Sequence, residues 1–95
     1  MDNGKFIILT NGTVTLPATN INEGVEFELM WFGNSGTTGT LVGSGAALLT
    51  VDNANSITNN NSVTISEKGG VIAAKYLGKK VDGSKNIWII TGTID

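Results

Sequence analysis

The residue types that carry most protein chemistry are few or missing in this sequence. Its 95 residues include no Cys and no His, and all six positive charges are lysines. Histidine and cysteine supply the usual nucleophile and acid–base pairs near neutral pH, and they are the commonest transition-metal ligands. We therefore expect a protein that is not an enzyme and that has no cofactor, no catalytic residues and no transition-metal site.

Any remaining chemistry has to come from carboxylates and amide oxygens. Asp52, Asn53 and Asn55 lie in one polar stretch, and such oxygen ligands can bind calcium. Their spacing does not follow the EF-hand pattern, and Asn-rich turns also form for backbone reasons, so calcium there stays an open question. Glu26 and Glu28 alternate along one strand, as solubilising residues do, whereas sugar hydrolysis requires two acids held across a cleft.

Charge and hydropathy restrict the kinds of partner. Eight carboxylates stand against six lysines, a net charge of −2, so the basic surface typical of proteins that bind nucleic acid or anionic membranes is missing. Lys79, Lys80 and Lys85 form the main lysine cluster and are typical of a solvated loop. No run approaches the ~18 apolar residues of a membrane span, and the first residues lack the basic start of a signal peptide. We expect no nucleic-acid partner and no membrane partner.

The composition is rich in Gly, Thr, Asn and β-branched residues, which predicts an all-β chain. Two runs in KFIILTNGTVTLP flank Asn11-Gly12, the pair that favours a tight hairpin turn. Further strands are predicted in GVEFELMWF, SVTIS, VIAAKYL and NIWIITG, and shorter ones at Thr40–Val42, Ala47–Val51 and Ser56–Thr58. We predict one domain over residues 1–95, a compact antiparallel β-sandwich or prism-like module of about eight short strands.

Alternation within the strands predicts which side chains are buried. One face of GVEFELMWF is predicted to line the core, with Val25, Phe27, Leu29 and Trp31. The opposite face begins with carboxylates and ends on Phe32, so we expect it to be covered near Phe32 by a second sheet or a second subunit. The closing run NIWIITG is apolar on both faces, with Trp88 and Ile90 on one and Ile87 and Ile89 on the other, so one of these faces must be covered.

The order of these segments resembles a family of known modules. The residues GTVTLPATNINEGVEFELMWFG, then SITNNNSVTISEKGGVIAAKYL and the ending DGSKNIWIITG are similar to the small β-modules of bacteriophage fibre, spike and head-decoration proteins. The resemblance spans residues 12–92, and the closing Trp motif is its most distinctive part. It implies a homotrimer without enzymatic activity that is made in the host cytoplasm and displayed on the surface of the virion.

That resemblance leads to two functional hypotheses. The first is a capsid decoration or cement protein, or a head-fibre protein, that binds the major capsid protein or another virion protein. The alternative is a receptor-binding module of a tail fibre or spike that recognises a host surface glycan. Because residues 1–9 extend beyond the family pattern with an apolar run, they are a candidate docking strand for an exposed capsid edge.

The residues assigned to these roles fall into two groups. The predicted partner or oligomer interface contains Phe6, Ile7, Ile8, Leu9, Phe32, Trp88 and Ile90. The predicted surface recognition loops contain Asn34, Ser35, Lys79, Lys80, Asp82 and Lys85.

Overall fold

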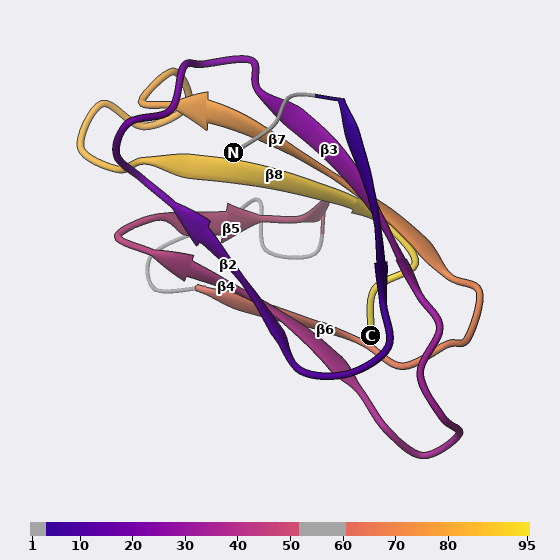
Figure 1. Cartoon of the computed structure of the whole chain (residues 1–95). Helices are drawn as coiled ribbons and strands as arrows, with labels where there is room; N and C mark the ends of the chain where they lie inside the picture. The colour runs from indigo at the N-terminus through magenta and orange to yellow at the C-terminus, as the bar shows by residue number, and fades with distance from the viewer. Residues whose placement is uncertain (1–3, 52–60) are drawn as a thin grey trace.

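The computed structural model describes residues 4–51 and 61–95, and it confirms an all-β chain folded as a sandwich of two sheets (Figure 1). The described residues contain eight strands and no α-helix. The strands are β1 (Lys5–Leu9), β2 (Thr13–Pro17), β3 (Glu26–Trp31), β4 (Gly39–Ser44), β5 (Ala47–Leu49), β6 (Ser62–Ile65), β7 (Val71–Gly78) and β8 (Ile87–Gly92). One sheet has the order β1-β3-β7-β8-β5, and the other has the order β2-β4-β6.

Both sheets are mixed, so the prediction of an antiparallel sandwich is wrong in its strand directions. β1 pairs with β3, β2 with β4, and β5 with β8 in parallel, while β3 with β7, β7 with β8, and β4 with β6 are antiparallel. Parallel neighbours require long crossover connections rather than tight turns. The chain therefore passes repeatedly from one sheet to the other.

The hairpin predicted at Asn11-Gly12 does not form, because β1 and β2 belong to different sheets. Gly12 does adopt a positive φ of 85°, as the turn prediction required. The turn carries the chain across the sandwich, so that Leu9 and Leu16 approach the core from opposite sheets. A dipeptide specifies a local bend, but tertiary burial decides which strand becomes the neighbour.

The other strand predictions are confirmed within small shifts of their ends. Thr40–Val42 lies inside β4, and the strand predicted at Ala47–Val51 ends at Leu49. The predicted strand at Ser56–Thr58 lies outside the described residues.

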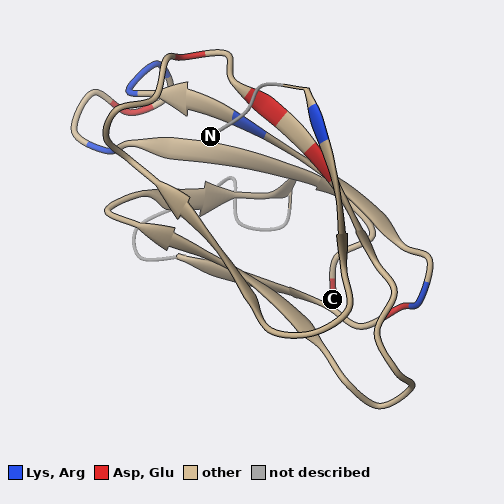
Figure 2. Cartoon of the chain, in the orientation of Figure 1, with Lys and Arg blue, Asp and Glu red and all other residues tan. Residues whose placement is uncertain are grey.

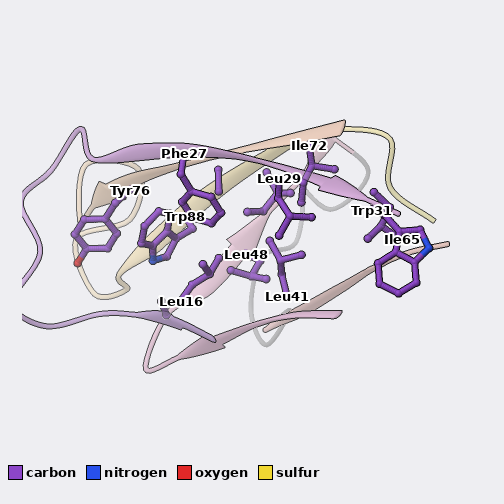
Figure 3. Packing of buried hydrophobic residues seen from close by; sticks show 13 residues of the cluster. Leu16, Phe27, Leu29, Trp31, Leu41, Leu48, Ile65, Ile72, Tyr76 and Trp88 are labelled. Carbon is purple, nitrogen blue, oxygen red and sulfur yellow. The ribbon is translucent and has the colours of Figure 1, made fainter. Parts of the chain in front are cut away.

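Apolar side chains from both sheets fill the space between them (Figure 3). The predicted core face of β3 is confirmed, since Phe27, Leu29 and Trp31 are buried. Trp88 from β8 is also buried, with its ring 6.0 Å from that of Phe27 and 5.2 Å from that of Tyr76. Its indole N–H donates a hydrogen bond to the Pro17 carbonyl at 2.9 Å, which joins the five-stranded sheet to the three-stranded one.

The closing strand β8 receives most of its cover from within the chain. Trp88 and Ile90 face the core, and Ile87 on the other face is also fully buried. Only Ile89 is half-buried in this apolar run. The apolar character of both faces therefore does not by itself require a partner subunit.

Trp31 fills the opposite end of the core and depends on two glycines. A Cβ added to Gly39 would lie 2.7 Å from Cε3 of Trp31 and 2.9 Å from Cδ2 of Leu9. A Cβ at Gly33 would collide with the far edge of the same indole ring. Two of the glycines in the glycine-spaced middle of the sequence, Gly33 and Gly39, are therefore explained by the space that the Trp31 ring occupies.

Replacing Trp88 with Ala is expected to lower the free energy of unfolding by about 3–5 kcal/mol, because a large buried aromatic side chain is lost. Urea denaturation followed by circular dichroism measures this change. A loss of only about 0.5 kcal/mol, typical of surface substitutions, would contradict the burial of Trp88 and show a side chain open to solvent.

Replacing Gly39 with Ala is expected to destabilise the fold by about 1–3 kcal/mol, because the added methyl group overlaps the rigid Trp31 ring. Gly83→Ala is the matched control, since a Cβ there meets no atom within 4 Å and Gly83 does not have a positive φ. The two unfolding midpoints would be compared under the same conditions. Equal midpoints for the two variants would show that Trp31 does not require the space at Gly39.

Candidate functional site

The outer face of the five-stranded sheet carries a patch of outward-facing apolar side chains, which are exposed except for the half-buried Met30. The apolar patch consists of Phe6 and Ile8 from β1, Met30 and Phe32 at the end of β3, and Val71 from β7. The register places Ile8 beside Met30 and Met30 beside Val71, so these three residues form one row across the strands. Phe6, Ile8 and Phe32 are 52%, 59% and 49% exposed. An apolar patch of this kind is typical of a protein interaction site.

Charged groups surround the apolar patch. Glu28 is the register neighbour of Phe6, and Glu26 is the register neighbour of Lys75 further along the same face. The ammonium group of Lys68 lies 4.5 Å from the centre of the Phe32 ring, in a cation–π contact. Figure 2 shows the charged residues on this sheet and on the loops, whereas β2, β4 and β6 carry none. The rim therefore contains both signs of charge.

The structure separates the predicted interface residues into three groups. Phe6, Ile8 and Phe32 are exposed and lie in the apolar patch, whereas Ile7 and Leu9 point inward and pack against the core.

The interface prediction is wrong for the other two residues, Trp88 and Ile90. Both are buried within the chain's own core, with 0% and 1% of their surface exposed. They have no surface to offer a partner, because the three-stranded sheet already covers them.

Met30 and Val71 belong to the apolar patch but were not among the predicted interface residues. The alternation of the strand near residue 30 indicated that Met30 faces outward. Only the register between β3 and β7 shows that Val71 lies beside it. That register depends on long-range pairing, which the sequence alone did not specify.

The two predicted recognition loops lie at opposite ends of the five-stranded sheet. Asn34 and Ser35 follow β3 and are exposed. Lys79, Lys80, Asp82 and Lys85 follow β7, which runs antiparallel to β3. The structure therefore does not bring the two loops together into one site.

The loop between β7 and β8 has a defined internal structure. The Asp82 carboxylate accepts hydrogen bonds from the Ser84 backbone N–H at 2.9 Å and from the Ser84 hydroxyl at 2.7 Å, and it lies 3.7 Å from the Lys85 ammonium group. The Ser84 N–H and hydroxyl, followed by Lys85, hold the pKa of Asp82 below its ordinary value. Lys80 pairs with Glu23 at 3.7 Å on the same end of the molecule.

A hollow of about 390 Å³ opens between this loop and the turn from β4 to β5. We call it the basic pocket, because two lysines line it and none of its described lining residues is acidic. Its side chains include Ala46, Ala47, Lys79, Ser84, Lys85 and Asn86. Sequence reasoning identified the two lysines, but it missed Ser84 and Asn86, which only the loop conformation brings to the hollow.

Metal binding receives no support within residues 4–51 and 61–95, where no group of three acidic side chains converges. The calcium candidates Asp52, Asn53 and Asn55 lie outside these ranges. None of the described residues belongs to a helix long and apolar enough to cross a membrane.

Comparison with known proteins found no matching family model, no matching curated protein and no matching solved structure. The resemblance to phage modules therefore rests only on the sequence segments quoted above.

The pKa of Asp82 is expected to lie below its ordinary value of 3.8. Removing the hydroxyl in Ser84→Ala should raise that pKa part of the way back, because the Ser84 backbone N–H still donates. Because the folded-state pKa is the lower one, ionised Asp82 stabilises the folded protein at pH values above its unfolded-state pKa. This stabilisation is lost as the pH falls through the folded-state pKa. NMR titration of the Asp82 carboxyl carbon measures the shift. An identical pKa in the variant would contradict the hydroxyl contact.

Proposed function

We propose that this chain is a non-enzymatic structural protein of a bacteriophage particle, either a capsid decoration or cement protein or a head-fibre protein. In this proposal three copies assemble through the apolar patch and are displayed on the virion surface. The observation that carries the proposal is the outward-facing row of Ile8, Met30 and Val71, in which Met30 is half-buried, extended by the exposed Phe6 and Phe32. The three-fold arrangement and the phage particle are implications of the sequence resemblance.

A second copy of the chain suits the apolar patch better than a strongly charged partner. The rim carries Glu28 and Glu26 as well as Lys75 and Lys68, so each copy offers both signs of charge to its neighbour. A chain of this size has a marginal core and no disulfide, and such domains often gain stability by oligomerisation. Covering Phe6 and Ile8 would remove exposed apolar area from water.

Attachment to the particle is assigned to the edge of β1. Among the described strands only β3 is paired with β1, which makes β1 an edge strand of the described sheet. An edge of this kind accepts an extended segment through main-chain hydrogen bonds. The predicted docking role of residues 1–9 is retained here for residues 5–9, with the major capsid protein or another virion protein as the partner.

The second candidate function is a receptor-binding module of a tail fibre or spike. The basic pocket favours it, since a hollow with lysine, amide and hydroxyl groups can recognise a host surface glycan. It is placed second because Phe6, Ile8 and Phe32 together indicate assembly more directly.

In solution the unmodified chain is expected to have about three times the 9.9 kDa chain mass by light scattering. Ile8→Glu is expected to yield monomers with an unchanged circular dichroism spectrum, because it places a charge within the proposed contact. Val81→Glu is the matched control: Val81 is 52% exposed but lies outside the apolar patch, so this variant should stay trimeric. A monomeric unmodified chain, or equal behaviour of the two variants, would contradict assembly through the patch.

Co-sedimentation separates the two candidate functions. A decoration protein is expected to pellet with capsids of a phage whose genome encodes the chain, and to raise their resistance to heat. A receptor-binding module is expected to pellet with host cells and to leave capsids unbound. Binding to cells alone would overturn the decoration proposal and favour the second candidate.

A further inference from the structure

We propose that the basic pocket binds a single anionic sugar unit, of which a uronic acid is the simplest form. The proposal deepens the second candidate function by naming the ligand class. It does not depend on the apolar patch, which lies toward the other end of the five-stranded sheet. The β4–β5 turn and the β7–β8 loop that form the pocket are seen together at the left of Figure 1.

Main-chain hydrogen bonds fix the walls of the pocket. The Ala47 N–H donates to the Asn86 carbonyl at 2.8 Å and ties the β4–β5 turn to the end of the β7–β8 loop. The Gly43 N–H donates to the Asn61 carbonyl at 2.8 Å on the opposite side. A Cβ at Gly43 would collide with the Ala46 carbonyl, so the turn can close this tightly only with glycine there. The hollow is therefore a feature of the folded backbone.

The charge of the pocket is opposite to that of the whole chain. The chain carries a net charge of −2, yet Lys79 and Lys85 line the hollow without any acidic residue among its described lining. Lys85 is partly compensated by Asp82 at 3.7 Å. Lys79 has no ion pair within the part of the chain that the structure describes, whereas its neighbour Lys80 is paired with Glu23. Lys79 is thus the cation available to an anionic ligand.

Neutral polar groups complete the set needed for a sugar. The Tyr76 hydroxyl lies 3.1 Å from Oδ1 of Asn86 and donates to it, which leaves the Asn86 amide nitrogen as a donor for a ligand. The Ser84 hydroxyl donates its proton to Asp82, so its oxygen remains an acceptor for a sugar hydroxyl. Ala46 and Ala47 add small apolar surfaces to the lining.

Size and charge together define the class of ligand. A hollow of about 390 Å³ lies at the lower end of the range for small-molecule sites. A neutral sugar would leave Lys79 without a counter-charge, and a nucleic acid would require an extended basic surface. One carboxylate on a hydroxylated ring satisfies the lysine, the amide and the hydroxyl. A phosphorylated sugar shares this chemistry, so phosphate is included in the test.

The test is an NMR titration of the ¹⁵N-labelled full chain with glucuronate, glucose and inorganic phosphate in parallel. We expect glucuronate to shift the backbone amides of Ser84, Asn86 and Gly45, which also lines the pocket, in a saturable way. It should bind about tenfold more tightly than glucose, because a charge-assisted hydrogen bond is added. Equal binding of glucose would overturn the anionic part of the proposal. Equal binding of phosphate would overturn the sugar part, and the absence of any saturable shift would overturn both.

Two lysine variants locate the site. Lys79→Gln is expected to weaken glucuronate binding about tenfold, while Lys80→Gln, whose parent side chain is paired with Glu23 outside the pocket, should leave it within about twofold. Equal losses of affinity in both variants would indicate an effect of general surface charge and would overturn the proposed binding site.

The inference and the receptor-binding function can fail separately. If host cells bind the chain but glucuronate does not, this inference fails while the receptor-binding function stands. If glucuronate binds and cells do not, the pocket stands without that function.

Discussion

The two sheets of this small sandwich are held face to face by the side chain of Trp88, and the remaining structure depends on that contact. Its ring packs against Phe27 and Tyr76 on its own sheet, and its N–H reaches the Pro17 carbonyl on the other (Figure 3). A buried indole N–H usually has a hydrogen-bond partner, and Trp88 has one in Pro17, whereas the buried Nε1 of Trp31 has none among the described residues. With no disulfide available, this combination of packing and hydrogen bonding fixes how the three-stranded sheet sits on the five-stranded one.

The surfaces available for function follow from that arrangement. Because the inner faces of both sheets are filled by the core, the outward residues of β1, β3 and β7 are left to form the apolar patch. Because β7 and β8 are antiparallel neighbours, their connecting loop returns to the end of the sheet where the β4–β5 turn also lies, and the basic pocket forms there. One fold thus provides an exposed apolar surface and a separate hollow, and our proposals assign assembly to the first and ligand binding to the second.

Local patterns in the sequence predicted the all-β class, most strand positions and the buried face of β3. The failures share one physical cause, which is that strand pairing is decided by contacts far apart in the chain. Asn11-Gly12 specifies a turn, but it does not tell whether the next strand stays in the same sheet. The apolar strand around Trp88 suggested a subunit contact, whereas the cover comes from Leu16 and its neighbours in the same core. The place of Val71 in the apolar patch follows from its register with Met30, which the sequence does not reveal.

The central claim is that the apolar patch is covered by copies of the same chain in solution. The most direct measurement is the relaxation of side-chain methyl groups by a soluble nitroxide, observed by NMR on the unmodified protein. Ile8 and Val81 are similarly exposed in the isolated chain, at 59% and 52%. Assembly through the patch predicts that the Ile8 and Val71 methyl groups are protected from the nitroxide while those of Val81 relax rapidly. Equal relaxation of Ile8 and Val81 would show that the patch faces solvent and would contradict the account.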